Sequence, residues 1–338
     1  MTIRHRNGSY EVRFVELEDL FRSIPASAFV VTDEHVRGLY GGQLAEGSRV
    51  FAAPPGESSK SLSEFERVCR WLAECGAGRD AELVAFGGGV VGDLCGFAAS
   101  TYMRGVRYVQ APSTLLAQVD SSVGGKVGVD LPEGKNLVGA FYPPAEVLIC
   151  TKLLESLSRR EFANGMAEVW KYAFILDAEF VGRLAGLAIG GEGLDAVVRR
   201  CIELKAEVVE EDEFETSGRR AVLNFGHTIG HAVEQASGYG TILHGEAISI
   251  GMVAEARLGE LLGVSRLGLA ADIRELLASS DLPTKIPALP ARDLMGAMRH
   301  DKKASGGRPA FSLVTEIGAC RLFSDVPEDK VMQALEAE

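Results

Sequence analysis

Three of the chain's six histidines fall between residues 227 and 244, with a spacing that could serve a metal site. His227 and His231 are four residues apart, which places both side chains on one face of a helix. His244 follows shortly before another helical pattern. Imidazole is a common zinc ligand, and a catalytic zinc site takes three protein ligands and leaves one position open. An isolated pair at this spacing is more often two hydrogen-bonded core histidines, so the rest of the chain must supply further ligands.

A carboxylate that could complete such a set lies in residues 160–175, whose pattern predicts a helix. Glu168, Lys171 and Tyr172 share one face of this helix. The plain alternative is a surface ion pair between Glu168 and Lys171, which would contribute only a few tenths of a kcal/mol. We expect Glu168 to join two of the three histidines, and spacing alone leaves open which two.

A second amphipathic helix is predicted over residues 194–209, and Lys205 falls on its apolar stripe. A buried ammonium without a partner is costly. One alternative is that the side chain extends along the apolar surface to water; the other, which we favour, is that it faces an anion in a cleft. The acidic run at residues 210–215 is predicted to be a solvated loop.

The first 150 residues alternate short apolar runs with helical patterns, which indicates a parallel sheet covered by helices. Strands are predicted at residues 27–32, 48–52, 82–86 and 147–150, and a later one at 311–314. Glycines 87, 89 and 92 match G-x-G-x-x-G directly after the third strand, which favours a nucleotide site over a tight structural turn. The segment about 20 residues further on offers no carboxylate for a ribose.

Residues 104–144 show few helix signals and place several polar side chains among glycines and turns. Arg104, Lys126, Lys135 and Asn136 would suit an anionic substrate that carries a phosphate or a carboxylate. The alternative is an ordinary solvated loop, and the two interpretations are about equally favoured by these residues alone.

Length and composition limit the function further. A chain of 338 residues favours two domains, which we divide as 1–150 and 151–338. The net charge of −12 argues against nucleic acid or an anionic membrane as the main partner. The six cysteines include no C-x-x-C, and no apolar run reaches about 18 residues, so we expect a cytoplasmic protein.

Taken together, seven sequence blocks resemble the 3-dehydroquinate synthase family and its sugar-phosphate cyclase relatives. They are residues 87–97, 104–129, 134–144, 160–172, 223–234, 244–247 and 301–303. The resemblance implies an α/β N-terminal Rossmann-like domain and a mostly α-helical C-terminal domain, with the active site in the cleft between them. It also implies a homodimer, NAD+ as cofactor, and Zn²⁺ or Co²⁺, between which the sequence does not choose.

The resemblance assigns roles residue by residue. The metal ligands would be Glu168, His227 and His244, with His231 turned to the substrate. Residues at the family's NAD+ positions are Asp33, Glu57, Lys60, Gly88, Gly89, Val90, Asp93, Ser113, Thr114, Lys126, Lys135, Ser156, Leu157 and Glu161. Substrate-binding and catalytic positions are Lys171, His231, Asp120, Arg220, Lys205, Asn224, Lys126, Asn136 and Arg104, the last contributed across the dimer, together with Lys302 or Lys303.

Two departures from the family pattern are visible. Ser158 stands where a proline usually precedes the helix of Glu168, and the link from Glu215 to Arg220 is one residue longer than is common. The role of Glu215 is therefore open.

The resemblance implies a complete reaction. The family converts the sugar-acid phosphate 3-deoxy-D-arabino-heptulosonate 7-phosphate to 3-dehydroquinate and phosphate, a step of the shikimate pathway to aromatic amino acids. It does so by transient oxidation with NAD+, phosphate elimination, reduction, ring opening and aldol closure. Two alternatives stay open: a related cyclase of secondary metabolism and a metal-dependent polyol dehydrogenase of the same fold.

Overall fold

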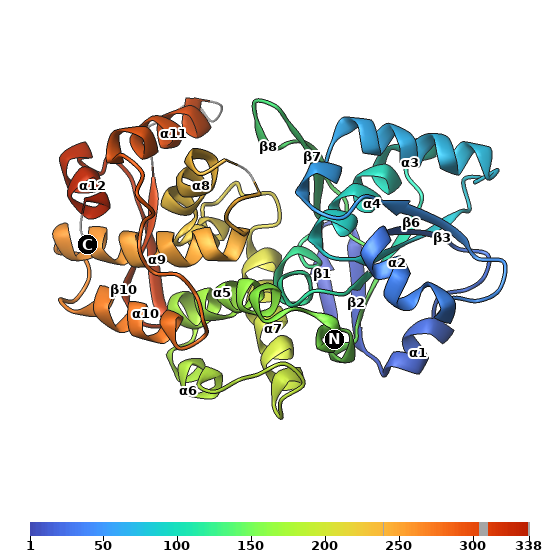
Figure 1. Ribbon diagram of the computed structural model, residues 1–338, viewed down its shortest axis with the longest axis horizontal. Coiled ribbons are helices and arrows are strands. Elements are labelled where there is room, and N and C mark those ends of the chain that lie inside the picture. The colour runs from blue at the N-terminus through green and yellow to red at the C-terminus, as the bar shows by residue number, and fades with distance from the viewer. Residues whose placement is uncertain (239, 304–309, 337–338) are drawn as a thin grey trace. The chain divides into compact units, whose positions relative to one another are not determined.

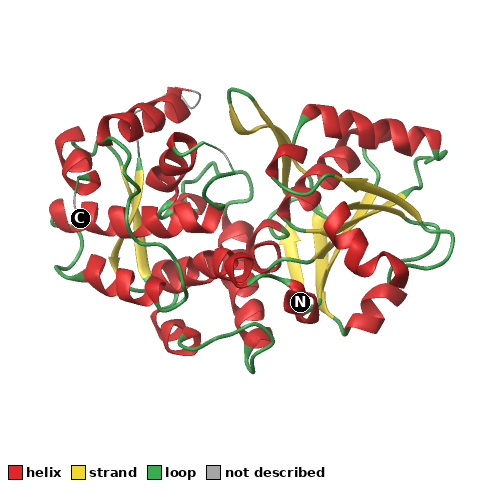
Figure 2. Ribbon diagram, in the orientation of Figure 1, coloured by secondary structure: helices red, strands yellow, loops and turns green. Residues whose placement is uncertain are grey.

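The structure is a computed structural model that describes residues 1–238, 240–303 and 310–336, without the side chains of residues 300–303. The chain divides into two compact units, Met1–Leu157 and Ser158–Glu338 (Figure 1). The sequence placed the division after residue 150, and the short 3-10 segment η5 (Thr151–Ser156) belongs with the first unit. Figure 2 shows that helices dominate the second unit, whereas the first is organised on a sheet.

The first unit contains a seven-stranded sheet in the order β1-β2-β9-β6-β5-β3-β4. The β1–β2 pair is antiparallel and the other neighbours are parallel. The strands are β1 (Thr2–His5), β2 (Gly8–Phe14), β3 (Phe29–Asp33), β4 (Arg49–Ala53), β5 (Glu82–Gly87), β6 (Arg107–Pro112) and β9 (Glu146–Ile149). The helices include α1 (Leu17–Arg22), α2 (Glu34–Tyr40), α3 (Leu62–Glu74) and α4 (Gly89–Thr101).

Both faces of this sheet are covered, because alternate residues of one strand point to opposite faces. Val31 and Ala85 pack with apolar residues of α3 and α4. Val30 and Val84 pack with apolar residues of α1 and α2. The predicted Rossmann-like α/β fold is therefore confirmed.

Residues 104–144, where the sequence indicated mainly turns, contain regular structure that the sequence analysis missed. They form the sheet strand β6 and the antiparallel hairpin of β7 (Lys126–Leu131) and β8 (Gly134–Phe141). Because β6 is buried along residues 108–112, it lacks the alternation of a half-exposed strand, and Gln110 and Pro112 interrupt its apolar run. The strands β1 and β2 were also not predicted.

The second unit is mostly helical, as expected. Its elements are α5 (Arg159–Leu176), α6 (Val181–Leu184), α7 (Leu194–Glu211), α8 (His227–Ala236), α9 (His244–Leu261), α10 (Leu269–Ala278), α11 (Ala291–Lys303), α12 (Glu328–Leu335), and the strand pair β10 (Phe311–Glu316) and β11 (Ala319–Phe323). Helix α9 contacts α5, α8, α10, α12 and β10. It is buried on most sides, which makes it the central element of this unit.

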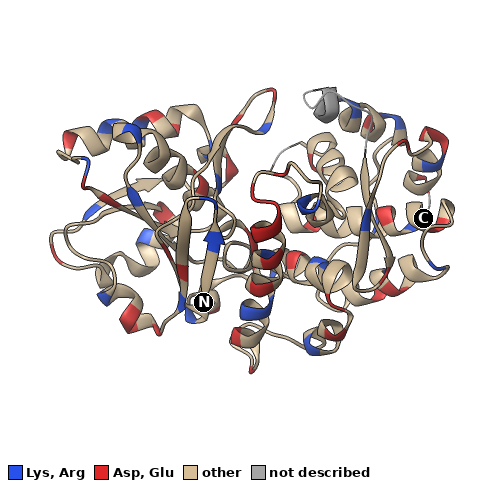
Figure 3. Ribbon diagram, turned by 180° about the vertical axis from the view of Figure 1, so that it is seen from behind, with Lys and Arg blue, Asp and Glu red and all other residues tan. Residues whose placement is uncertain are grey.

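The surface carries charges of both signs. Figure 3 shows Lys and Arg interspersed with Asp and Glu over both units. Among the helices that the structure describes, none combines the length and apolar character needed to cross a bilayer.

Candidate active site

Three helices of the second unit bring Glu168, His227 and His244 together. Glu168 lies in α5 and is fully buried. The Nε2 atoms of His227 and His244 are each 3.6 Å from its Oε1 atom. Zinc bonds of about 2.0–2.1 Å in a tetrahedral site separate two ligand atoms by roughly 3.4 Å, so these side chains fit a metal ion. This triad is the cluster of possible metal ligands found among the described residues, and its ligand atoms all lie within 4.8 Å of one another.

The second ring nitrogen of each histidine also faces an acceptor. The Nδ1 atom of His227 is 3.2 Å from the carbonyl oxygen of Phe225. The Nδ1 atom of His244 is 3.8 Å from an Oε2 carboxylate oxygen of Glu234. Histidine ligands of metals usually donate their second N–H to such a group, which fixes the ring and leaves Nε2 for the metal. Two imidazoles and a carboxylate suit Zn²⁺ or Co²⁺ equally.

Glu234 is a site residue that sequence reasoning missed. It lies in α8 seven residues after His227, so the two share a helix face, and this spacing was the available signal.

His231 lies beside the triad. Its ring centroid is 5.3 Å from that of His227 and 5.9 Å from that of His244. It is therefore placed to contact a molecule bound at the metal position, although it is not one of the three clustered ligands.

Lys171, one turn after Glu168 in α5, is buried and forms an ion pair with the Glu168 carboxylate. Burial and the positive charge of Lys171 hold the pKa of His227 well below its usual value. Burial also opposes protonation of His244, but hydrogen bonds to Glu168 and Glu234 outweigh it and raise the pKa of His244 to about 9. A metal at this position would therefore have to displace a proton from His244.

Two further cations of the second unit are buried. Lys205 lies on the buried side of α7, where the sequence favoured an anion-facing lysine. Arg220 begins the 3-10 segment η7 (Arg220–Asn224) and is 3% exposed. Its Nη1 donates to the carbonyl oxygen of Glu213 at 2.8 Å, and its Nε is 3.5 Å from an oxygen of Glu215. Glu215, whose role was open, therefore pairs with Arg220. Asn224, at the end of η7, is exposed.

The acidic run before Arg220 is only in part the solvated loop that the sequence predicted: Phe214 and Glu215 lie in an exposed loop, whereas Glu210 and Glu211 end a helix and Asp212 is buried. Helix α7 continues to Glu211, and the Asp212 side chain accepts hydrogen bonds from the backbone amides of Thr216, Ser217 and Arg220 at 2.8–3.1 Å. Burial by itself would raise the pKa of Asp212. The hydrogen bonds from these amides have the larger effect and hold the pKa well below its usual range. Asp212 thus fixes the loop that delivers Arg220.

Several of the expected cofactor residues of the first unit, among them Asp33 and Gly88, lie at the carboxyl ends of β3 and β5. β3 has β4 on one side and β5 on the other, which is a topological switch point, where ligands bind in open α/β sheets. Asp33 ends β3, and its carboxylate accepts the amide of Val36 at 2.8 Å, which caps α2. Gly88 is the N-cap of α4 and has no side chain, so the first amides of this helix can face an anion. A Cβ at Gly88 would come within 3.1 Å of the Thr114 side chain.

Charged residues of the same unit are tied together. The Lys60 ammonium is 2.6 Å from the Asp93 carboxylate and donates to Asn136 Oδ1 at 2.5 Å. Lys135 pairs with Glu57 at 3.1 Å. Four expected cofactor residues therefore gather with Asn136, which the resemblance had assigned to the substrate phosphate.

The remaining predicted residues occupy several places. In the first unit, Gly89 and Val90 start α4, and Ser113 follows β6. Asp120 lies in the π-helical turn at Ala117–Ser121, and Ser156 and Leu157 end the unit. Two cations are exposed: Lys126 at the start of β7, and Arg104, which has a left-handed φ of 69°. Glu161 lies in the first turn of α5, where its amide donates to Ser158 Oγ at 3.2 Å. This N-cap accounts for serine in place of the usual proline. The side chains of Lys302 and Lys303 lie outside the described residues.

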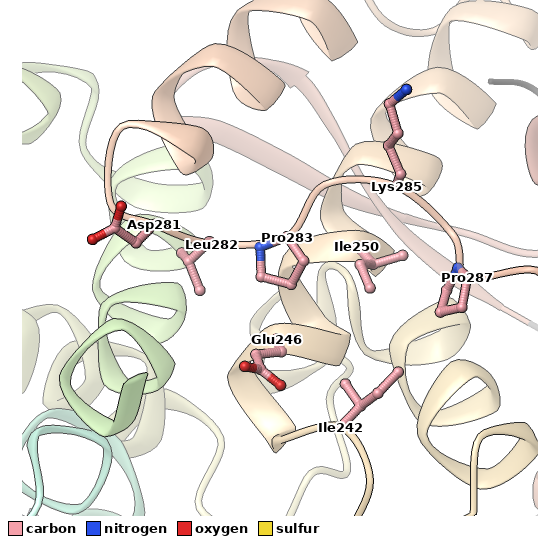
Figure 4. Close-up of a pocket in the computed structure, with 8 residues that line it drawn as sticks. All are labelled: Ile242, Glu246, Ile250, Asp281, Leu282, Pro283, Lys285 and Pro287. Carbon is pink, nitrogen blue, oxygen red and sulfur yellow. The ribbon is translucent and has the colours of Figure 1, made fainter. Parts of the chain in front are cut away.

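A pocket at the start of α9 is separate from the triad. Its lining is Ile242, Glu246, Ile250, Asp281, Leu282, Pro283, Lys285 and Pro287 (Figure 4). Arg160 holds Glu246 with two hydrogen bonds of 2.6 and 2.8 Å. The pocket shares no lining residue with the three ligands, so it is not the candidate active site.

Two family models match the chain one after the other. The family model 3-dehydroquinate synthase N-terminal matches residues 50–164, and 3-dehydroquinate synthase C-terminal matches residues 165–304. The chain is 47% identical over 320 residues to 3-dehydroquinate synthase of Acidithiobacillus ferrooxidans. The aligned region covers 91% of this chain and 88% of the relative.

Two solved structures are similar over almost the whole chain. One is 2-epi-5-epi-valiolone synthase from Streptomyces hygroscopicus subsp. jinggangensis with NAD+ and Zn²⁺ bound. Its TM-score is 0.87 at 29% identity, and the match covers 98% of this chain and 97% of that one. The other is 2-deoxy-scyllo-inosose synthase complexed with carbaglucose-6-phosphate, NAD+ and Co²⁺, with a TM-score of 0.84, 26% identity, and coverage of 99% and 98%. The two family models and the curated relative together show that the chain belongs to the 3-dehydroquinate synthase family.

Proposed function

We propose that this chain converts 3-deoxy-D-arabino-heptulosonate 7-phosphate to 3-dehydroquinate and phosphate, with NAD+ and a divalent metal as cofactors. The observation that carries the proposal is the convergence of Glu168, His227 and His244 beside Lys171 and His231. The family's enzymes are phosphate-eliminating cyclases, and a relative with 47% identity is a 3-dehydroquinate synthase.

In this proposal, Glu168, His227 and His244 hold Zn²⁺ or Co²⁺, and the Asp33, Gly88 and Lys60 region of the first unit holds NAD+. Support comes from the donor set, from the switch point between β3 and β5, and from the NAD+ and metal ions in the two similar structures. When bound, NAD+ supplies reversible oxidation of the substrate, and the metal polarises the alcohol that is oxidised.

The chain's own residues bind and orient the substrate. Arg220 and Lys205 are buried cations and would bind the substrate carboxylate, because a cation and a carboxylate form strong charge-assisted hydrogen bonds where water is excluded. His231 would contact the phosphate, with Asn224, Lys126, Asn136 and one of Lys302 and Lys303 as further partners.

The hydroxyl groups of the substrate would be held by Lys171 and Asp120. Lys171 is placed for this role because it lies one turn from the ligand Glu168. Fixing the carboxylate, the phosphate and the hydroxyl groups at once holds the ring in a reactive geometry, which removes much of the entropic barrier.

We also propose that the enzyme acts as a cytoplasmic homodimer in which Arg104 reaches the partner's site. Arg104 is exposed, so its side chain is accessible to a partner subunit, and its left-handed φ of 69° is a strained conformation of the kind that is common at functional sites. Light scattering after gel filtration should give twice the mass of 36.1 kDa, and a monomer in the active preparation would contradict the dimer.

The experiment that tests the function is a phosphate-release assay with purified, metal-loaded protein and catalytic amounts of NAD+. We expect many turnovers for each NAD+ and no net accumulation of NADH. Stoichiometric reduction of NAD+ would indicate a polyol dehydrogenase instead. Turnover of sedoheptulose 7-phosphate or glucose 6-phosphate, without turnover of the seven-carbon keto acid phosphate, would indicate a related cyclase.

A further inference from the structure

Another buried carboxylate, Glu255 of α9, contacts the start of the helix that carries His227. Glu255 is fully buried. Its Oε2 atom accepts the backbone amide of Gly226 at 2.7 Å, and its Oε1 atom accepts that of Ile229 at 3.1 Å. Gly226 is the N-cap of α8, and Ile229 is the third residue of this helix. Both amides lack a partner within the helix, so one side chain from another helix satisfies two of them.

Helix α8 cannot provide this cap from its own residues. Gly226 has a φ of +82°, and a Cβ there would lie 2.5 Å from Met252 Cγ and 2.9 Å from the carbonyl oxygen of Ile248. A serine, threonine, aspartate or asparagine at this position is therefore excluded. The third helical residue, which often returns a carboxylate to the N-cap amide, is Ile229. The contact between α8 and α9 thus removes the local cap, and α9 replaces it.

The capped turn is the one that presents the metal ligand. His227 directly follows Gly226, and its Nδ1 is held by the carbonyl oxygen of Phe225. Glu255 belongs to α9, whose first residue is His244. The two hydrogen bonds therefore tie the helix that carries one histidine ligand to the helix that carries the other. Because the negative charge lies at the N-terminus of α8, it is also stabilised by the helix dipole.

We propose that Glu255 is a positioning residue for the metal site: it fixes the first turn of α8 so that His227 Nε2 meets the same carboxylate oxygen as His244 Nε2. The inference rests on the proposed metal site. Glu255 itself is not a ligand, and it acts through the direction of the His227 side chain. Residues that orient the ligands of metal sites typically change metal affinity by about 10- to 100-fold when they are replaced.

The chain contains a matched control on the same helix. Glu260 of α9 accepts the amide of Ala270 at 2.8 Å, at the start of α10. This contact has the same chemistry as those of Glu255, a carboxylate of α9 that accepts a backbone amide in the first turn of another helix. The residues of α10 lie outside the proposed site, so Glu260→Gln reports the effect of the same substitution at a helix-capping carboxylate of α9 that does not position a ligand.

The test compares Glu255→Gln and Glu260→Gln in the full-length protein. Glutamine has one acceptor oxygen, which is enough for the single amide at Glu260. At position 255 the glutamine NH₂ group would face one of the two amides that Glu255 accepts, so one of these hydrogen bonds is lost. The affinities for Zn²⁺ and Co²⁺ are measured by chelator competition, the Co²⁺ ligand field by visible absorption, and the fold by far-UV circular dichroism. We expect Glu255→Gln to bind both metals at least tenfold more weakly with an altered Co²⁺ spectrum, whereas Glu260→Gln binds them as the parent does.

Parental metal affinity in Glu255→Gln, or an equal loss in both variants, would overturn the proposal. If Glu255→Gln does not fold, Glu255→Asp keeps the charge with a shorter reach and decides in the same way: weaker metal binding supports the proposal and parental binding overturns it. The parent protein separates this inference from the proposed function. A parent that binds neither metal refutes the metal site itself, whereas a parent that binds metal while Glu255→Gln binds it equally refutes only the role of Glu255.

Discussion

The sharpest consequence of the triad is that two histidines on one helix, His227 and His231, should behave differently when each is replaced by alanine. His227 Nε2 lies 3.6 Å from Glu168 Oε1, as a shared metal ion requires, and His231 lies outside the clustered ligand set. We therefore expect His227→Ala to lose metal. His231→Ala should keep metal affinity close to that of the parent and lose turnover.

The size of the first effect follows from the number of ligands. Structural zinc sites with four ligands have apparent binding free energies of about 10–16 kcal/mol, so one ligand contributes on the order of 3 kcal/mol. A loss of this size weakens metal binding by roughly a hundredfold. The two remaining ligands of His227→Ala would also leave a second open position, which water fills.

The assay titrates each variant with Zn²⁺ against a chromophoric chelator and measures phosphate release with saturating metal in parallel. His231→Ala is the matched control, because it removes the same side chain one turn further along the same helix. Equal loss of metal in both variants would refute the split between ligand and substrate contact. Loss of metal in His231→Ala alone would reverse the two roles.

Three further outcomes are expected. Ser158→Ala removes the side chain that accepts the Glu161 amide and should lower the free energy of unfolding by about 1 kcal/mol in urea titrations, so an unchanged value would contradict the cap. Asp212→Asn tests the lowered pKa of Asp212. The carboxylate stabilises the folded protein fully above the pKa that Asp212 has in the unfolded chain, near 4, and this stabilisation is lost as the pH falls toward its lower pKa in the folded protein. The urea midpoints of parent and variant should therefore differ most at pH 7 and converge below about pH 4, and a constant difference would contradict this. Asp93→Asn leaves Lys60 without its charged partner, and calorimetry should show roughly tenfold or greater loss of NAD+ affinity with unchanged metal affinity, whereas a parallel loss of both would contradict separate sites.

Periodicity determined a large part of this fold. The alternation of apolar strands and helical patterns predicted the covered parallel sheet, and the strands near residues 29–33, 49–53 and 82–87 lie within two residues of their expected starts. Strand β6 was missed because a strand buried on both faces carries no alternation, and its run is broken by Gln110 and Pro112. The hairpin of β7 and β8 was missed because its glycines and polar residues indicated turns.

For the site, the residue types and their helical spacing determined that Glu168, His227, His231 and His244 are the candidates for metal chemistry. Local spacing does not determine which of them share a metal, because the set combines residues of three helices. That choice depends on how α5, α8 and α9 pack, which brings two Nε2 atoms to one oxygen of Glu168. The family resemblance had assigned the same three residues, and the packing provides the physical reason.

The tertiary structure alone revealed the groups that hold this site in place. Glu234 faces His244, Asp212 fixes the loop of Arg220, and Glu255 caps the helix of His227. In the sequence Glu255 is simply a carboxylate in an apolar helix, since its partner amides lie 26 and 29 residues away. A carboxylate that must be buried can be stable only against donors such as these. Residue type and spacing therefore determine which groups can do the chemistry, whereas the close packing of helices decides which of them meet and what holds them there.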